Sequence, residues 1–450
     1  MTSNAPEHLS VKSKLAYGAG DLGAAITAAI TGFFLNAFLL DVAQLRPSAV
    51  GIIFLLSTLW DAITDPIVGN LSDRTRSRWG RRRPWLLFGA VPFGLTFIMQ
   101  WLVPELDENG LFIYYLLAAL LLKTAFTAVN IPYTSLTPEL TPNYDERTRL
   151  TAYRFSFSIL GGVAAVGLHP VIVGFFGDVK TGHAVSAGVW AVFIILSALT
   201  TFSFTRETAP ISNAPQIGFM EGLRITLSNR PFLFVTGIYL LSWLTLQFVQ
   251  TNLLLYVRYW VNAEDSFTLL VLILQVTAFL ALGLWSWVSA RIGKKRTYYI
   301  GATLWLVVMG LVFFIPPNSL TPLYFVSFFA GLGVSVAYLI PWSMLPDVVE
   351  YDELQTGQRR EGAYYGFFVF LQKLGLSLGL AVSNFVLDAA GYVNPEVAGG
   401  VVTQPDSVLL VLRLFISLVP MVILLISLPI AAAYPITPQK FEEIRAQLNH

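Results

Sequence analysis

The chain has 450 residues, of which 55% are hydrophobic and only 12% charged, and its formal net charge at pH 7 is +1. This composition is typical of multi-spanning membrane proteins and argues against a large soluble fold. A net charge so close to zero gives no basic field for nucleic acid, and the lack of cysteine excludes disulfides, thiol catalysis and cysteine-based metal centres. No two histidines stand at metal-ligand spacing; they are His8, His169, His183 and His450.

Apolar runs of membrane-spanning length recur along the chain. A helix needs about 20 predominantly apolar residues to cross a bilayer, and such runs predict twelve spans in two sets of six. The N-terminal half, 15–204, has predicted spans at 15–40, 48–69, 84–103, 111–137, 150–176 and 184–204. A polar connector at 205–230 leads to the C-terminal half, 231–433. Its predicted spans are 231–257, 266–289, 297–315, 321–344, 362–387 and 408–433.

The distribution of lysine and arginine predicts the orientation in the membrane. Most of the 28 basic residues fall in the two tails and in the loops on the same side as the tails. The loops on the opposite side hold Arg46, Lys180 and Arg258. Because short cytoplasmic loops are enriched in lysine and arginine, we expect both termini in the cytoplasm and the protein in the plasma membrane, which is the inner membrane in a bacterium.

Two short motifs of the first half recur in the second half in the same order. The sequence GRRR at 80–83 is echoed by GKKR at 293–296, and IPYTSLTPE at 131–139 is echoed by IPWSMLPD at 340–347. This repetition predicts an internal duplication. Two six-helix halves in parallel repeat form the architecture of the major facilitator fold, so the predicted fold class is an all-α polytopic membrane protein of that kind.

Two aspartates, Asp61 and Asp65, lie four residues apart inside the second predicted span. A charge at the bilayer centre costs about 2.5 to 3.5 kcal/mol on insertion scales, and such residues usually face a polar path for an ion or substrate. The spacing puts both carboxylates on one helix face, where they repel each other unless a cation lies between them. We predict a cation site formed by Asp61 and Asp65 with Thr127 and Asn130 of the fourth span, and no metal beyond Na⁺.

Charged residues within other spans leave alternatives open. Arg154 and Lys373 have no acid close by in the sequence. On a structural interpretation, Lys123 or Lys373 forms an ion pair with the two aspartates. On a functional one, Arg154 and Lys373 neutralise these acids when no cation is bound, or they bind substrate hydroxyls, a carboxylate or a phosphate. Asp21, inside the first span, either binds substrate or pairs with a basic residue.

The C-terminal half contributes further candidate substrate residues. Gln250 and Asn252 put a polar face on the seventh span, where they meet sugar hydroxyls or form interhelical hydrogen bonds. Tyr338 and Trp342 add aromatic surface beside a break expected at Pro341. The full set of predicted substrate residues is Asp21, Arg154, Gln250, Asn252, Tyr338, Trp342 and Lys373.

The basic loop after the second span has a specific pattern. Asp73 precedes the arginines that follow Gly80, so it can pair with neighbouring helix ends, as in a conformational latch. The alternative is an ordinary basic cytoplasmic loop. The predicted cytoplasmic gate comprises Gly69, Asp73, Arg74, Arg81, Arg82, Glu139 and Asp347.

Several motifs together resemble the glycoside–pentoside–hexuronide:cation symporters, the sodium:galactoside family of the major facilitator superfamily. They are WDAITDP at 60–66, NIPY at 130–133, DER at 145–147 and PDVVEY at 346–351. The resemblance covers almost the whole chain. It implies symport of a small glycoside with Na⁺ or H⁺ by alternating access. It also implies that Asp61 and Asp65 bind the cation beside Thr127 and Asn130, and that Arg154 and Lys373 are cavity cations.

The chain departs from this family at two positions. Where melibiose permease has sugar-binding aspartates on helices 1 and 4, this chain has Ala25 and Asn130. The change removes a hydroxyl acceptor and a negative charge, which disfavours melibiose itself and leaves Na⁺ or H⁺ open. The segments at 39–44 and 340–347 are also similar to the animal sodium-dependent lysophosphatidylcholine symporters. This second resemblance implies a lysophospholipid as the alternative cargo, with Lys373 or Arg154 on its phosphate.

An enzyme is not expected. The sequence GLSLG at 375–379 matches a hydrolase nucleophile pattern, but that pattern requires a strand–turn–helix context and here it lies within a predicted span. A membrane enzyme or a non-transporting sensor is the remote alternative. We expect no cofactor and a monomer whose partners are a small-molecule substrate and the lipid bilayer, without nucleic acid.

Overall fold

The structure, a computed structural model, describes residues 9–141, 144–207, 219–358, 360–395 and 403–448. The regular elements of these residues are all helices, so the predicted all-α class is confirmed. The chain divides into two compact units. Unit 1 comprises 1–214 together with 394–401, and unit 2 comprises 215–393 together with 402–450.

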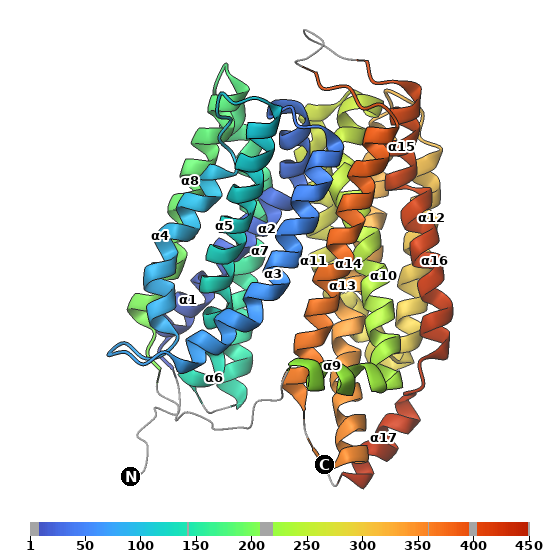
Figure 1. Cartoon of the computed structure of the whole chain (residues 1–450). Coiled ribbons are helices and arrows are strands. Elements are labelled where there is room, and N and C mark those ends of the chain that lie inside the picture. Colours follow the sequence, from blue (N-terminus) through green and yellow to red (C-terminus); the bar gives the residue numbers. More distant parts are fainter. Residues whose placement is uncertain (1–8, 142–143, 208–218, 359, 396–402, 449–450) are drawn as a thin grey trace. The chain divides into compact units, whose positions relative to one another are not determined.

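Unit 1 contains the helices α1 to α8 of Figure 1. Their bounds are α1 Val11–Ala19, α2 Asp21–Ile30, α3 Pro47–Arg74, α4 Arg83–Met99, α5 Glu108–Thr134, α6 Thr137–Leu140, α7 Tyr144–Gly174 and α8 Val179–Phe204. Two π-helical segments, η1 Thr31–Leu35 and η2 Phe38–Val42, follow α2. Within the unit α3 packs on α5, α4 on α8 and α2 on α7.

Unit 2 contains the helices α9 to α17. Their bounds are α9 Phe219–Ser228, α10 Arg230–Tyr256, α11 Phe267–Ile292, α12 Lys294–Phe313, α13 Thr321–Thr356, α14 Glu361–Ala389, α15 Asp406–Ile416, α16 Leu418–Ala433 and α17 Pro438–Gln447. Short segments, η3 Val257–Val261 and η4 Glu264–Ser266, join α10 to α11. Here α13 packs on both α11 and α12, and α10 packs on α14 and α16.

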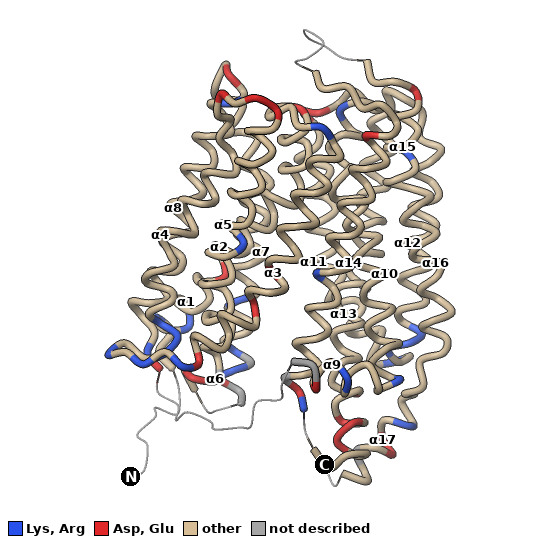
Figure 2. Tube along the Cα trace, in the orientation of Figure 1, with Lys and Arg blue, Asp and Glu red and all other residues tan. Residues whose placement is uncertain are grey.

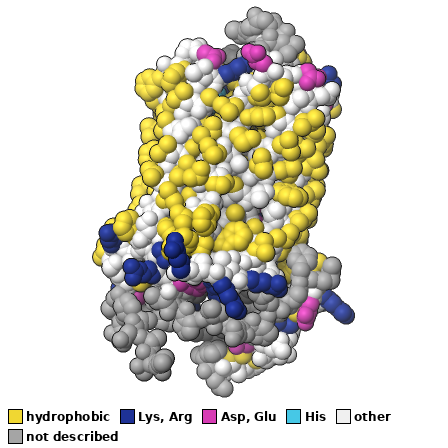
Figure 3. All heavy atoms as spheres, turned by 60° about the vertical axis from the view of Figure 1, so that its left-hand side comes forward, with side chains coloured by type: hydrophobic (Ala, Val, Ile, Leu, Met, Phe, Trp, Pro, Cys, Tyr) yellow, Lys and Arg dark blue, Asp and Glu magenta, His cyan; other side chains and the backbone are white. Residues whose placement is uncertain are grey.

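The described helices account for the predicted spans. Eleven helical segments are long and apolar enough to cross a membrane, and the apolar helix α4 is shorter. Lysine, arginine, aspartate and glutamate gather near the helix ends and are sparse along the middles (Figure 2). In Figure 3, hydrophobic side chains cover most of the face in view. Exposed apolar side chains and charged ends are what a bilayer-embedded helix requires.

Polar caps begin several of the spans. The carboxylate of Asp107 accepts the N–H of Gly110 (3.1 Å) at the start of α5, and that of Asp178 accepts the N–H of Thr181 (2.9 Å) at the start of α8. Asn229 accepts the N–H of Phe232 (3.1 Å) at the start of α10. Each cap satisfies a backbone donor that has no partner within its helix, so the sequence determines these starting points locally.

The break expected at Pro341 is wrong. Helix α13 runs through Pro341 and Pro346 and ends only at Thr356, well beyond the predicted end at 344. In a buried membrane helix, neighbouring helices and local adjustments compensate for the missing proline hydrogen bond. The helix stops where Gly357 adopts a positive φ of 68°, a conformation that glycine allows.

The close approach of α12 and α13 depends on Gly301. A Cβ at Gly301 would lie 2.1 Å from Cγ2 of Val336, whereas a Cβ at Gly310, on the same helix, would lie 3.7 Å from Sδ of Met421. Val336 is buried and its β-branched side chain has few rotamers to escape into. We expect Gly301→Ala to lower the free energy of unfolding by roughly 1 to 3 kcal/mol.

The measurement is thermal unfolding of the purified protein in detergent. Gly310→Ala is the matched control, since the same substitution in α12 meets ordinary van der Waals contact there. Equal melting temperatures for the two variants would contradict the packing described for α12 and α13.

Candidate functional site

The two aspartates of α3 converge on one hydroxyl group of α5. Oγ1 of Thr127 lies 3.0 Å from Oδ1 of Asp61 and 2.9 Å from Oδ1 of Asp65. Thr127 and Asp61 are buried, and Asp65 is partly buried. A hydroxyl has one hydrogen and can donate it to only one of the two carboxylates. The other oxygens therefore form a cluster of negative charge and lone pairs suited to a hard cation.

Lys123 takes part in the same cluster. Its Nζ lies 3.6 Å from Oδ2 of Asp61, so the ion pair that the structural interpretation expected is present beside the hydroxyl contact. The indole Nε1 of Trp60 donates to Oγ1 of Thr124 (2.8 Å), which is a second polar tie between α3 and α5. The two helices are thus fixed against each other at the level of the acids.

Asn130 lies on α5 three residues after Thr127 and is partly buried. In the part of the chain that the structure describes, its amide makes no hydrogen bond with either aspartate. Carboxylates, a hydroxyl and an amide oxygen are the ligand types that alkali and alkaline-earth cations take. The described residues contain no group of three or more histidines, cysteines and acids, as a transition-metal centre would need.

Asp21 and Arg154 form an ion pair within unit 1. Nε of Arg154 lies 3.0 Å from Oδ1 of Asp21, so the arginine without an acid nearby in sequence has one in space. The guanidinium also lies 5.8 Å from the ring centre of Tyr133, whose hydroxyl donates to the carbonyl of Tyr17 (2.7 Å). This ion pair agrees with the alternative in which Asp21 pairs with a basic residue. A role of Asp21 in substrate binding stays a prediction.

The candidate substrate residues of unit 2 have different surroundings. Asn252 is fully buried and donates to Oγ of Ser383 (2.9 Å). This interhelical hydrogen bond joins α10 to α14. Gln250 is partly buried on α10, and Lys373 is partly buried on α14.

Tyr338 and Trp342 belong to an aromatic cluster that also includes side chains of α10. The ring of Tyr338 lies 5.2 Å from that of Trp243, and Nε1 of Trp342 donates to the hydroxyl of Tyr239 (3.1 Å). Trp342 keeps 37% of its surface exposed. These two rings therefore line an aromatic surface of α10 and α13, while Asn252 is enclosed between helices.

The predicted gate is an ion-pair network at the ends of α3 and α4. Arg81 contacts Glu139 at 2.8 Å and Arg82 contacts it at 3.1 Å, while Arg82 also binds Asp73 and the hydroxyl of Ser72. The hydrogen bond to Glu139 raises the pKa of the Arg81 guanidinium, and burial acts in the opposite sense. One carboxylate thus joins two arginines from the loop before α4.

Three members of the predicted gate lie outside this network: Gly69, Arg74 and Asp347. Arg74 is exposed at the end of α3 and enters none of the ion pairs given for the described residues. At Gly69 a Cβ would make only an ordinary contact, 3.8 Å from Ile131, so space does not require glycine there.

Glu207 was not found by sequence reasoning. Its carboxylate accepts the backbone N–H groups of Arg81 (2.8 Å), Arg82 (2.8 Å) and Arg83 (3.0 Å), and it lies against Gly80, whose φ is 99°. A carboxylate at a helix start satisfies free backbone donors and complements the helix dipole. The sequence feature that could have identified Glu207 is its position as an acidic residue shortly after the sixth predicted span.

Asp347 belongs to a corresponding network in unit 2. Nζ of Lys294, in the repeat of the gate motif, lies 2.7 Å from both carboxylate oxygens of Asp347 and 2.6 Å from the carbonyl of Ser343. Asp347 is therefore held within its own unit by the lysine of the echoed GKKR sequence.

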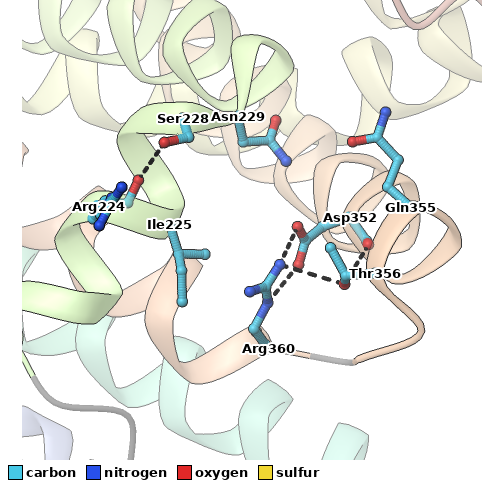
Figure 4. A pocket seen from close by; sticks show the side chains of 8 residues that line it. All are labelled: Arg224, Ile225, Ser228, Asn229, Asp352, Gln355, Thr356 and Arg360. Atoms are coloured by element: carbon cyan, nitrogen blue, oxygen red, sulfur yellow. Dashed lines mark hydrogen bonds and ion pairs between the residues drawn. The ribbon is translucent and has the colours of Figure 1, made fainter.

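A cavity of about 300 Å³ lies beside α9, α13 and α14 of unit 2. Arg360 points at Asp352 there, with its Nη2 2.6 Å from Oδ1, and the same nitrogen contacts Thr356 (Figure 4). The hydrogen bond to Asp352 raises the pKa of the Arg360 guanidinium. Arg224 of α9 lines the same cavity. The carboxylate of Asp352 neutralises Arg360. We therefore interpret this ion pair as a structural contact between helix ends, and we do not assign the cavity as the substrate site.

The fold also brings together His169 and His183, which lie far apart in the sequence for a metal-ligand pair. The ring centres of His169 and His183 lie 5.2 Å apart, and Nδ1 of His169 is 2.8 Å from Oγ of Ser186. Trp101 stacks on His183 at 5.5 Å. The turn between α7 and α8 brings these residues together, which the spacing along the chain did not reveal.

Comparisons with known proteins agree with this arrangement of helices. A sequence model of the family described as MFS/sugar transport protein matches residues 16–438. An uncharacterized symporter of Synechocystis sp. is 38% identical over 98% of this chain and 97% of its own length. The sodium-dependent lysophosphatidylcholine symporter 1-A of Danio rerio is 32% identical over 98% of this chain and 88% of its own length.

The solved structures show the fold alone. A bacterial homolog to the human lysosomal transporter Spinster, in its inward-facing and occupied conformation, aligns with a TM-score of 0.70 at 13% identity. The alignment covers 96% of this chain and 97% of that one.

The gate network generates a stability prediction. Glu139→Gln leaves Arg81 and Arg82 without their shared negative charge at a site where Glu139 is buried. Breaking a buried pair from one side is strongly destabilising, so we expect a loss of roughly 3 kcal/mol in the free energy of unfolding.

Chemical unfolding in detergent measures this difference. Glu108→Gln is the control because it breaks an exposed ion pair. The side chain of Glu108 is 51% exposed and that of its partner Arg46 is 70% exposed, and exposed pairs contribute about 0 to 1 kcal/mol. A loss for Glu139→Gln no greater than for the control would rule out the network as a source of stability.

Proposed function

The chain belongs to the family of MFS/sugar transport proteins, and from this premise we propose that it is a sodium-coupled symporter of a lysophospholipid. The family and the relatives bear the names of transporters and symporters, not of enzymes. The protein is accordingly a secondary symporter of the major facilitator kind. The cargo and the coupling ion are the parts that we propose.

One observation carries the choice of cargo. The relative from Danio rerio, matched over 98% of this chain, is named a sodium-dependent lysophosphatidylcholine symporter. The sequence motifs alone favour a glycoside over a lysophospholipid, and the name of this relative supports the opposite order. Ala25 is consistent with the reversal, because a methyl group in place of an aspartate cannot accept bonds from sugar hydroxyls.

A glycoside remains the second candidate because the family description names sugar transport.

The coupling ion is proposed to bind at Asp61 and Asp65. The hydroxyl of Thr127 lies 3.0 Å from an oxygen of Asp61 and 2.9 Å from an oxygen of Asp65, and Asn130 follows one turn later on α5. A bound Na⁺ screens the repulsion of the acids and fixes α3 against α5. If cargo binds better to that ordered form, cargo strengthens Na⁺ binding by the same factor. Moving one Na⁺ charge through the membrane potential contributes about 2.3 kcal/mol per 100 mV.

Lys373 is proposed to bind the phosphate of the cargo. It is one of the two cations that the resemblance implied for the cavity, and it is partly buried on α14. A long flexible ammonium group is a good partner for a phosphate. Transport is proposed to proceed by alternating access in the plasma membrane, with both termini in the cytoplasm and the Arg81–Arg82–Glu139 network acting as a cytoplasmic gate.

The coupling proposal is tested with Asp65→Asn. This change keeps the size of the side chain and removes one of two cation-binding charges, so we expect sodium-driven uptake to fall to the level of protein-free liposomes. The assay measures labelled lysophosphatidylcholine in proteoliposomes with an inward Na⁺ gradient, and albumin extracts lipid that has only entered the outer leaflet. Asp265→Asn, at an exposed loop carboxylate, is the control. Full gradient-dependent uptake by Asp65→Asn would overturn the site.

The cargo proposal is tested with Lys373→Gln. Loss of a charge-assisted hydrogen bond, worth about 1.5 to 3 kcal/mol, raises the KM for lysophosphatidylcholine roughly tenfold or more. Lys373→Arg is expected to retain most of the affinity because the charge remains. The same proteoliposomes are also given labelled melibiose. Uptake of melibiose without uptake of the lysolipid would restore the glycoside as cargo.

A further inference from the structure

The cavity of about 300 Å³ in unit 2 lies at the ends of several helices (Figure 4). Its lining comes from α9, from Asn229 at the start of α10, from the C-terminal end of α13, and from Arg360 just before α14. The candidate spans of α10 and α14 begin at Arg230 and Ala363, shortly after this lining. Because membrane spans begin near the lipid headgroups, the cavity lies where the phosphate groups of a bilayer are within reach.

Arg224 carries an exposed positive charge at this cavity. Its side chain enters none of the ion pairs given for the described residues. Arg360 lines the same cavity, and its Nε and Nη2 donate to the carboxylate of Asp352 at 2.9 and 2.6 Å. That pair uses one edge of the guanidinium plane and leaves Nη1 outside it. Because a phosphate group accepts several N–H donors at once, two guanidinium groups on one cavity suit it.

Glu221 is the acid that opposes an anion here. It lies one turn before Arg224 on α9 and is exposed, and its charge acts on Arg360. Water and salt screen an exposed carboxylate, so Glu221 weakens the attraction for an anion without cancelling it. Removal of Arg224 and removal of Glu221 are therefore expected to change anion binding in opposite directions.

Helix α9 has one buried face and one exposed face. Gly222 and Thr226 are buried, whereas Arg224 and Leu227, three residues apart on one side of the helix, are exposed. Leu227 exposes 44% of its surface. An exposed arginine beside an exposed leucine is typical of helices that lie at a membrane surface, where the cation contacts phosphates and the apolar side chain contacts acyl chains.

From these observations we propose that the cavity binds the phosphate group of an anionic phospholipid, with Arg224 as the main contact. Arg360 adds a second guanidinium group, and Leu227 contacts the acyl chains. The lipid is the source of the phosphate, because a soluble phosphate would gain nothing from the exposed leucine. A bound lipid joins α9 to the ends of α13 and α14, so it stabilises the folded protein. The inference concerns neither the cargo nor the coupling ion.

A cavity that only holds solvent makes a different prediction. In that case anionic lipid would act through the overall charge of the membrane surface, and every exposed arginine near that surface would contribute alike. Arg230 allows the comparison, since it is exposed at the start of α10 and is not among the residues that line the cavity.

The experiment measures thermal unfolding of the purified full-length protein in detergent, without cargo and without a sodium gradient. Dioctanoylphosphatidylglycerol is titrated in at constant ionic strength, and the half-saturating concentration is read from the rise in melting temperature. We expect Arg224→Gln to raise this concentration about fivefold, because the variant loses one arginine contact with an anionic lipid. Glu221→Gln is expected to lower it about twofold.

Two control variants and two control ligands complete the design. Arg224→Lys keeps the charge and is expected to retain most of the affinity, and Arg230→Gln is expected to leave the half-saturating concentration unchanged. Dioctanoylphosphatidylcholine has a zwitterionic headgroup, and inorganic phosphate has no acyl chains. Both are expected to stabilise the protein less than the anionic lipid at the same concentration.

Equal half-saturating concentrations for Arg224→Gln and Arg230→Gln would overturn the cavity as the binding site. Equal stabilisation by phosphatidylcholine would overturn the preference for an anionic headgroup, and equal stabilisation by inorganic phosphate would overturn the lipid as its source. Absence of any stabilisation by phosphatidylglycerol would overturn the whole inference. Each of these results leaves the proposed symport untouched, since no cargo or ion gradient enters the measurement.

Discussion

The convergence of two acids on one hydroxyl group is the constraint on which the rest of the site depends. Asp61 and Asp65 belong to a single helix face, and Thr127 alone cannot satisfy both, since it has one hydrogen to donate. The remaining demand for positive charge requires an ion, a lysine, or both. Helices α3 and α5 must therefore hold a fixed register, which the bond from Trp60 to Thr124 supports.

The other charges of unit 1 are arranged so that they do not compete for this place. Asp21 is matched with Arg154, Lys14 with Glu146, and the arginines before α4 with Glu139. Each of these pairs is closer than that of Lys123 with Asp61. Tightly paired charges hold the helices together, while the loosely paired one lies at the proposed cation site.

The sequence was sufficient for the helices and for part of the site, and physical reasons explain the remainder. Length and apolarity identify the spans because a bilayer admits few other structures, and the spacing of Asp61 and Asp65 identifies their shared face. The acid partner of Arg154 depends on how α2 packs on α7, which local pattern does not encode. The continuation of α13 through Pro341 likewise depends on neighbouring helices.

The clasp that Glu207 forms on the first turn of α4 has a mechanical consequence. Three backbone N–H groups and one carboxylate make the end of the sixth span and the start of the third a single rigid piece. A displacement of Glu207 is therefore transmitted to the backbone of Arg81 and Arg82 before any of these hydrogen bonds has to break. The end of α8 is therefore coupled mechanically to the two arginines that bind Glu139.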